Sequence, residues 1–152
     1  ALDKPANDIQ GMVIGGHGDT TMIPLTRLAS YNGTPVHQFL SETALEKVAA
    51  DTMVGGATLT KLLGTSAWYA PGASVSYLVA SLLHDQNRMI PCSVYLEGEY
   101  GESDICIGVP CIIGKNGVES IVDVKLDSAE QEKFQKSSAA VRTMNEALKD
   151  VL

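Results

Sequence analysis

The sequence feature that most constrains the fold is a pair of apolar, β-rich runs, residues 105–113 and 118–126, separated by a four-residue turn. The turn reads Gly-Lys-Asn-Gly, and glycine and asparagine tolerate the positive φ angles that tight turns require. Two such runs joined in this way predict a β-hairpin, whose strands are antiparallel. A third apolar run, residues 89–96, is expected to form a further strand. The sequence therefore favours a mostly antiparallel sheet.

Apolar residues at helical spacing predict helices before and after these strands. The first helix begins near Glu42, with Ser41 as its N-cap, and the two glycines at residues 55–56 are expected to loosen or kink it. Residues 57–63 resume the helical pattern, which Gly64 is expected to cap. Helices that precede and follow antiparallel strands define an α+β fold.

Two later helices are predicted with apolar faces that would pack in the core. Pro71 fits the first turn of one helix, and the other follows Asp127, which forms a capping-box pattern with Glu130. The first of these helices has an apolar stripe made of Val75, Leu78, Val79, Leu82 and Leu83. The last helix is expected to end near Leu152. Its apolar face comprises Phe134, Val141, Met144, Leu148 and Val151 or Leu152.

The N-terminal third predicts short strands separated by glycine-containing turns. Residues 9–14 form an apolar run that ends at a glycine-rich loop, and residues 20–24 are expected to be extended. Asn-Gly at residues 32–33 is a turn signal before a short strand at residues 34–36. Residues 26–30 fit neither a helix nor a strand clearly.

The composition excludes several classes of function. The 152 residues fit one domain with a sizeable core, and the net charge of −7 comes from 18 acidic and 11 basic residues. Lysine and arginine are scattered, so no basic surface for nucleic acid is expected. No apolar run approaches the roughly 20 residues of a membrane span, and the start lacks the pattern of a signal sequence. The sequence therefore predicts a cytoplasmic protein that binds neither nucleic acid nor membranes.

The first residues suggest that the chain is a fragment. Ala-Leu-Asp-Lys at residues 1–4 reads as the end of a helix, without an initiator methionine, and Pro5 would terminate that helix. A nucleotide-binding signature of the form G-x-G-x-x-G does not occur in the sequence.

Cysteine usage argues against disulfides and against metal binding. The three cysteines, Cys92, Cys106 and Cys111, are odd in number and form no C-x-x-C pair, so neither a disulfide framework nor a zinc site is expected. All three lie in strand-like apolar runs, where cysteine behaves as a small hydrophobic residue. We interpret each as a core residue.

Candidate chemistry centres on His17, which lies in the segment Gly-Gly-His-Gly-Asp at residues 15–19. Histidine has the unperturbed pKa nearest neutrality, and flanking glycines let a ligand approach the imidazole closely. The pattern suits a general acid or base. It also fits a structural loop histidine, and the residues alone leave both interpretations open. We interpret His37 and His84 as solvated surface residues.

Five separated segments resemble malate dehydrogenases of the lactate dehydrogenase-like type. These segments occur in order along the chain: GGHGDTTMIPLTRLASYNGTPV at residues 15–36, GTSAWYAP at 64–71, LEGEYG at 96–101, GVP at 108–110 and GKNGVE at 114–119. The resemblance runs from about residue 9 to the C-terminus. It implies that residues 1–152 are the C-terminal, substrate-binding domain of a two-domain enzyme whose N-terminal Rossmann domain is absent.

The resemblance implies an NAD-dependent oxidoreductase that interconverts malate and oxaloacetate in the tricarboxylic acid cycle. It implies that His17 is the general acid/base beside the nicotinamide, with Pro71 also on the cofactor side. It implies a substrate pocket wall that includes Gly16, Ser66 and Ala67, and a small residue at Ala67 resembles malate rather than lactate enzymes. The family is usually dimeric or tetrameric, so a homo-oligomer is expected.

Several parts of the family's mechanism have no counterpart in this chain. The aspartate that pairs with the histidine, and the arginine that grips the substrate carboxylate, lie upstream of the histidine in the family. Asp19 and Arg27 follow His17 and match neither role, so we interpret them as a loop carboxylate and a surface cation. The chain alone is therefore expected neither to bind NAD tightly nor to turn over.

Two alternatives remain open from the sequence. One is a dehydrogenase for another 2-hydroxy acid, such as lactate, because the selectivity loop of the family lies outside the chain. The other is a free-standing interaction module that keeps the fold without the chemistry. The retained Gly-Gly-His-Gly-Asp segment at residues 15–19 argues against the second alternative.

Overall fold

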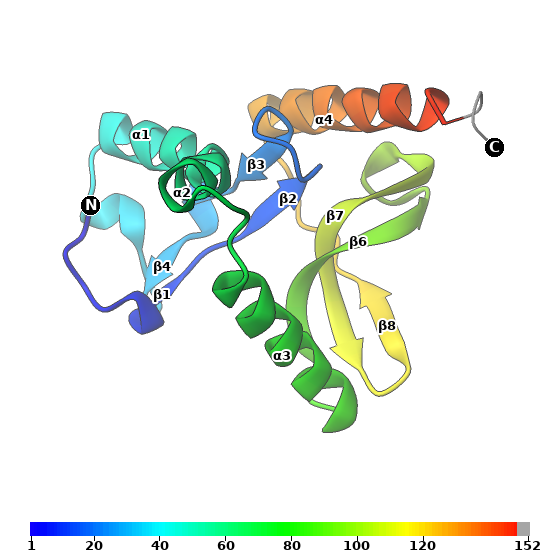
Figure 1. Cartoon of the computed structure of the whole chain (residues 1–152), viewed down its shortest axis with the longest axis horizontal. Coiled ribbons are helices and arrows are strands. Elements are labelled where there is room, and N and C mark those ends of the chain that lie inside the picture. The colour runs from blue at the N-terminus through cyan, green and yellow to red at the C-terminus, as the bar shows by residue number, and fades with distance from the viewer. Residues whose placement is uncertain (149–152) are drawn as a thin grey trace.

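The computed structural model of the protein describes residues 1–148, in which two antiparallel sheets are surrounded by α-helices (Figure 1). The smaller sheet has the order β1-β4-β5, and the larger has the order β3-β2-β7-β6 with β8 paired to β7. The strands are β1 (Ile9–Gln10), β2 (Val13–Gly15), β3 (Met22–Pro24), β4 (Ser30–Tyr31), β5 (Thr34–Pro35), β6 (Arg88–Glu97), β7 (Ser103–Gly114) and β8 (Gly117–Ile121). The helices are α1 (Glu42–Met53), α2 (Gly55–Leu63), α3 (Tyr69–Leu83) and α4 (Ser128–Glu146). The predicted α+β class is confirmed.

Strand β7 is the centre of the larger sheet because it pairs with three other strands. β6 runs antiparallel along nearly its whole length. β8 pairs with its C-terminal end, where Gly114 lies opposite Gly117, so the predicted hairpin is confirmed. β8 ends at Ile121, earlier than predicted, and β2 meets β7 at one position, Gly15 opposite Gly108.

The core lies where α3 and α4 pack against β7. Alternate residues of the strand are buried: Ile105, Ile107, Val109, Cys111 and Ile113. Phe134 of α4 is fully buried in the same cluster. Each such apolar side chain contributes about 1.5–3 kcal/mol when it leaves water.

The predicted strand at residues 9–14 is wrong in one respect, because the structure divides it. Ile9 and Gln10 pair with β4 in the smaller sheet, whereas Val13 and the residues after it pair with β3 in the larger sheet. Gly11, between the two strands, has no side chain to pack and lets the chain change sheets. The Asn-Gly turn at residues 32–33 is confirmed, with both residues at positive φ between β4 and β5.

The predicted helix caps are confirmed. Ser41 accepts a hydrogen bond from the Ala44 backbone N–H at the start of α1. The helix ends at Met53, and α2 restarts at Gly55. Gly64 ends α2 in the left-handed region, with φ +69°. Local residue choice therefore determines where these helices begin and end.

The prediction that the whole apolar stripe of α3 packs in the core is wrong for three of its five residues. Leu78 and Leu82 pack against the core, but Val75, Val79 and Leu83 are exposed. A helix that lies on one sheet buries only its narrow contact face. The centre of that face is polar: Ser81 is fully buried and donates a hydrogen bond to the Ile113 carbonyl over 2.7 Å.

Helix α4 begins with the predicted capping box, in which the Asp127 carboxylate accepts the Glu130 N–H and the Glu130 carboxylate accepts the Asp127 N–H. Its predicted apolar face is correct for Phe134 and for Val141, which also packs against the core. Met144 and Leu148, near its C-terminal end, are exposed instead. Val151 and Leu152 lie outside the described residues.

Two further expectations need correction. Residues 1–5 are not helical in the structure, so the expected helix end at residues 1–4 is not seen. Cys111 is buried and Cys92 is half-buried, as expected of core residues, but Cys106 is exposed. Successive side chains of a strand point to opposite faces, and Cys106 lies between the buried Ile105 and Ile107.

Candidate active site

His17 lies in the loop that joins β2 to β3, here called the His17 loop (residues 16–21). The loop leaves β2 at Gly15, whose φ of +92° is unfavourable for any residue with a side chain. A β-carbon at Gly15 would lie 2.5 Å from the Thr21 carbonyl oxygen, and one at Gly108 would lie 2.6 Å from the Gly15 oxygen. Glycine is thus required where the loop, β2 and β7 approach each other.

A buried serine of α4 holds the N-terminal end of the loop. The Gly16 N–H donates to the Ser137 Oγ over 2.8 Å, and the same hydroxyl donates to the Thr21 carbonyl over 2.7 Å. One side chain therefore connects the first and last residues of the His17 loop.

A tight turn holds the other side of His17. The Gly18 N–H donates to the Thr21 Oγ1 over 2.8 Å, and the Thr21 N–H donates back to the Gly18 carbonyl over 2.9 Å. His17 therefore lies between two residues whose backbone is hydrogen-bonded, while its own imidazole is exposed. A fixed backbone with an accessible ring suits proton exchange with a bound molecule.

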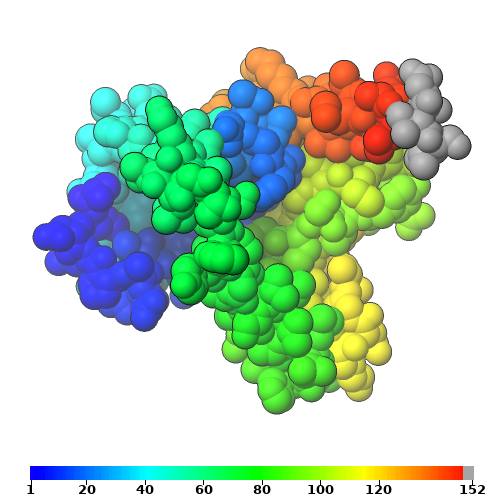
Figure 2. All heavy atoms as spheres, in the orientation of Figure 1, coloured from blue at the N-terminus to red at the C-terminus, as the bar shows by residue number. Residues whose placement is uncertain are grey.

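His17 and Gly16 line an open groove of about 730 Å³, whose other lining residues come from β2, β3, β6 and β7 of the larger sheet and from α3 and α4. Polar groups from other elements share this groove: the Ser74 hydroxyl from α3, the Ser93 hydroxyl from β6 and the Cys106 thiol from β7. Figure 2 shows the blue atoms of the hairpin between the green atoms of α2 and the yellow-green atoms of β6 and β7. The groove thus brings a histidine together with small polar side chains.

The structure does not bring all the predicted site residues to this groove. Ser66, Ala67 and Pro71 lie in the connection from α2 to α3 and in the first turn of α3, outside the groove lining, and only Ala67 is half-buried. The groove is lined instead by Ser74, which sequence reasoning missed as a site residue. Ser74 is one helical turn beyond Pro71, so the helical period was the signal that could have found it.

Trp68 and Tyr69, in the same connection and the first turn of α3, do not pack in the core. Their side chains are 71% and 86% exposed, and the two rings contact each other edge to face with centroids 6.5 Å apart. This contact leaves most of both apolar surfaces in water.

Arg27 is an ion-pair partner more than a free surface cation. Its guanidinium donates to both carboxylate oxygens of Glu130, at 2.7 and 2.9 Å, and to the Lys125 carbonyl at 2.6 Å. The pair joins the segment after β3 to the first turn of α4. Asp19 is exposed in the turn of the His17 loop.

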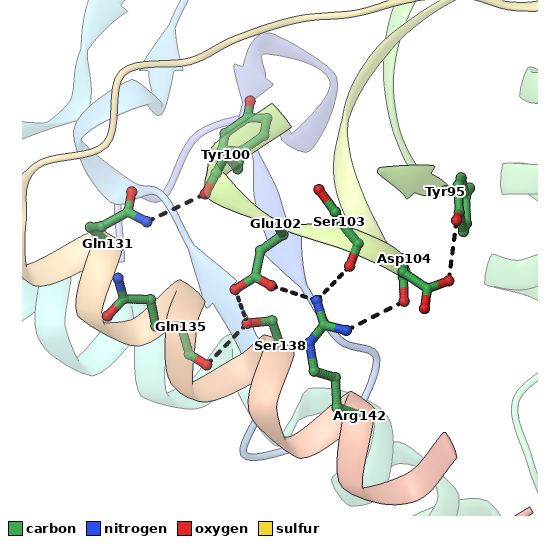
Figure 3. Close-up of polar contacts among 9 residues, drawn as sticks. All are labelled: Tyr95, Tyr100, Glu102, Ser103, Asp104, Gln131, Gln135, Ser138 and Arg142. Atoms are coloured by element: carbon green, nitrogen blue, oxygen red, sulfur yellow. Dashed lines mark hydrogen bonds and ion pairs between the residues drawn. The ribbon is translucent and has the colours of Figure 1, made fainter. Parts of the chain in front are cut away.

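Figure 3 shows a second polar cluster, which ties α4 to the start of β7. Arg142 donates to the Glu102 carboxylate over 2.9 Å and to the Ser103 carbonyl over 2.6 Å, and the Ser138 hydroxyl donates to the other oxygen of Glu102. Burial alone would raise the pKa of Glu102, but these hydrogen bonds and the charge of Arg142 lower it below its usual value. The cluster fixes the helix that carries Ser137.

Other kinds of site have no support in the described part of the chain. Within residues 1–148, no three His, Cys, Asp or Glu side chains are grouped so that they could hold a metal ion. None of the helices in that range combines the length and the apolar character needed to cross a membrane. Burial raises the pKa of the Cys111 thiol to about 11, so this cysteine is poorly suited to nucleophilic chemistry.

Comparison with known proteins identifies the family. Residues 1–151 match the model of the lactate/malate dehydrogenase α/β C-terminal domain. The chain therefore belongs to the lactate/malate dehydrogenase family, as its C-terminal domain.

The relatives of the chain include malate dehydrogenases. The chain is 76% identical over all its residues to the malate dehydrogenase of Flavobacterium frigidimaris, of which it covers 49%. It superposes on malate dehydrogenase from Salinibacter ruber with a TM-score of 0.94 and 39% identity, covering 99% of this chain and 49% of that one. Lactate dehydrogenase from Eimeria maxima, solved with NADH and oxamate, gives a TM-score of 0.92 and 36% identity, covering 99% and 48%. The chain thus spans about half the length of the relatives it matches.

Proposed function

We propose that residues 1–152 are the C-terminal, substrate-binding half of a longer enzyme, called here the full-length enzyme, that interconverts malate and oxaloacetate with NAD. The observation that carries this proposal is a loop histidine, held by backbone hydrogen bonds on both sides, in a chain 76% identical to a malate dehydrogenase. The match to a lactate dehydrogenase of 36% identity makes lactate and pyruvate the second candidate substrates.

In this proposal His17 is the general acid/base. Its protonated imidazole donates a proton to the carbonyl oxygen of oxaloacetate, and its neutral imidazole accepts the proton back from the hydroxyl of malate. Exposure of the ring at the groove supports this role, because a substrate can reach it. A positioned acid/base typically contributes about 10²–10⁴ in rate.

The described residues do not fit a whole NAD molecule. The sequence contains no G-x-G-x-x-G, and the strand pairs described in residues 1–148 are antiparallel, whereas dinucleotide phosphates bind where a parallel strand turns into a helix. We therefore assign the dinucleotide to a second domain of the full-length enzyme. His17 and Pro71 are assigned to the nicotinamide end, where bound NADH would supply the hydride.

The segment of residues 64–71 supplies the other proposed contacts. Ser66 and Ala67, with Gly16 beside the histidine, are assigned to the substrate pocket, and the small side chain of Ala67 supports a dicarboxylic acid as substrate. Exposed apolar side chains on α2, on α3 and on the connection between them support contacts with the second domain and with another copy of the enzyme: Leu62, Leu63, Trp68, Tyr69 and Leu83. We also propose a cytoplasmic location, because a reducing compartment suits three unpaired thiols.

The test replaces His17 by Asn in the full-length enzyme and measures oxaloacetate reduction and NADH binding. The expected result is a loss of turnover of about 10²–10⁴-fold with NADH affinity retained, because only the proton donor is removed. His37→Asn is the control, since His37 is also exposed but lies outside the groove. Unchanged turnover in H17N would remove His17 from the mechanism.

Two further measurements test the rest of the proposal. If the full-length enzyme preferred pyruvate to oxaloacetate as substrate, the proposed activity would be that of a lactate dehydrogenase and not of a malate dehydrogenase. Saturable NADH binding by residues 1–152 alone would contradict the assignment of the dinucleotide to another domain.

A further inference from the structure

The hydroxyl of Ser137 occupies an unusual place for a residue of α4. Its side chain is 2% exposed, and it connects the Gly16 N–H to the Thr21 carbonyl, residues that lie 121 and 116 positions away in the sequence. The two partners are the first and last residues of the His17 loop. One buried oxygen atom therefore bridges the two ends of the loop, in addition to the pairing of Gly15 with Met22 between β2 and β3.

We propose that Ser137 is a positioning residue for His17, an inference that rests on the function proposed above. Strand pairing fixes Gly15, which lies opposite Met22 of β3 and Gly108 of β7, and Ser137 adds a hydrogen bond to Gly16, the residue directly before His17. With the hydroxyl present, the backbone on both sides of His17 is fixed, so the imidazole meets the substrate in one orientation. A displacement of about 1 Å in a catalytic group can cost roughly 100-fold in rate.

The surroundings of Ser137 leave little room for a substitute partner. A β-carbon at Gly15 would lie 2.8 Å from its Oγ, and one at Gly16 would lie 3.2 Å from a Val141 methyl group. Removal of the hydroxyl would leave the Gly16 N–H and the Thr21 carbonyl without their buried partner. The loop would then relax to satisfy these groups elsewhere, and His17 would move with it.

Ser138 provides a matched control within the same helix. It is also 2% exposed and donates hydrogen bonds, but to the Glu102 carboxylate and to the Gln135 carbonyl over 2.5 and 3.0 Å. Ser137→Ala and Ser138→Ala thus remove the same atom from neighbouring, equally buried positions. Only the first change touches the His17 loop.

The experiment compares both variants in the full-length enzyme. We expect both to lower the melting temperature, but only Ser137→Ala to lower kcat for oxaloacetate reduction, by about 10–100-fold, with the KM for NADH unchanged. We also expect faster hydrogen exchange at the amide of Gly16 in that variant alone. Equal kcat values in S137A and S138A would overturn the proposal.

A second pair of variants separates positioning from packing. Ser137→Thr and Ser137→Val add the same bulk, but only threonine retains the hydroxyl, so any misfit of the extra methyl group is common to both. We expect kcat to be about tenfold higher in S137T than in S137V, and equal values would refute the role of the hydroxyl. The two proposals can fail separately. Turnover retained in H17N would refute the acid/base role of His17. Turnover lost in H17N but retained in S137A would refute only the positioning role of Ser137.

Discussion

The His17 loop and the segment from Gly64 to Pro71 begin alike and are supported very differently. Each follows a glycine in the left-handed region, Gly15 at φ +92° and Gly64 at φ +69°. At Gly15 an added β-carbon would collide with the Thr21 carbonyl and Ser137, whereas at Gly64 it would meet no atom within 4 Å. The N-terminal end of one segment packs against its own chain, and the other segment stands in solvent.

This difference separates two tasks of the proposed enzyme. The backbone on both sides of His17, the proposed acid/base, is held by hydrogen bonds within residues 1–148. The segment proposed to contact substrate and cofactor carries exposed aromatic side chains and requires another surface to cover them. The backbone beside His17 is thus held within the described residues, whereas the aromatic side chains of residues 64–71 stand in solvent.

The largest expected effect comes from alanine at the two glycines. Gly15→Ala combines overpacking, about 1–3 kcal/mol, with a disfavoured positive φ, roughly 1–2 kcal/mol, so the free energy of unfolding should fall by about 2–5 kcal/mol. Gly64→Ala meets only the second cost, roughly 1–2 kcal/mol. Chemical denaturation of both variants measures the difference. Equal losses would mean that the start of the His17 loop is no more tightly packed than the start of the exposed segment.

An intermediate effect is expected from the cluster that fixes α4 (Figure 3). Arg142→Ala removes the cation bound to Glu102 and should lower the free energy of unfolding at pH 7 by about 1–2 kcal/mol, the lower part of the range for hydrogen bonds to charged groups. Lys136→Ala is the control, because Lys136 pairs with Glu132 on the exposed face of the same helix. If K136A lowered the free energy of unfolding as much as R142A does, the cluster would stabilise the chain no more than an exposed ion pair does.

The variant R142A also tests how the stability of the chain depends on pH. The pKa of Glu102 is lower in the folded chain than its usual value, so its contribution to stability is present above the usual carboxyl pKa and is lost as pH falls through the folded value. Without Arg142 the folded pKa rises, and this acid-dependent part of the unfolding curve should flatten. A pH dependence unchanged in R142A would contradict the assigned cause.

The smallest effect is expected in the exposed segment. Trp68→Ser should change the free energy of unfolding of residues 1–152 by less than about 0.5 kcal/mol, because the side chain is 71% exposed. In the full-length enzyme the same change should destabilise the protein measurably, since the ring is proposed to be covered there. Thermal unfolding of both forms makes the comparison. Equal, small changes in both would show that nothing covers Trp68.

The sequence predicted those elements that neighbouring residues determine. The capping box of Asp127 and Glu130, the Ser41 cap and the Gly64 cap each depend on contacts within a few residues. The hairpin around residues 114–117 is equally local. Patterns of this kind are visible in the order of the amino acids, because both partners lie in the same short window.

The sequence did not predict features that depend on distant parts of the chain. Val75 and Leu83 are exposed because another side of α3 packs against β7. The apolar pattern of the helix alone does not show which side that is. Cys106 is exposed because β7 has two faces, only one of which is covered along its length. The change of sheet at Gly11 depends likewise on strands that follow it in sequence.

The candidate site shows the same division. His17 and its glycines stand together in one motif, and sequence alone marked them. Ser74 and Ser137 come from helices far along the chain, and neither belongs to a motif of its own. Ser137 lies three residues after the buried Phe134 and four before Val141, so a serine on an apolar helix face was the available signal.

The link between Gly16 and Ser137 also has a consequence for the order of folding. Strands β6, β7 and β8 follow one another closely in the chain, so they can pair early, whereas the Gly16–Ser137 contact closes a loop of 121 residues. Closure of long loops carries a greater entropy cost and tends to come late. A nascent chain would therefore acquire its sheet first and its oriented histidine last, when α4 docks. The backbone beside His17 would then be held in place only in molecules in which Gly16 and Ser137 have already met.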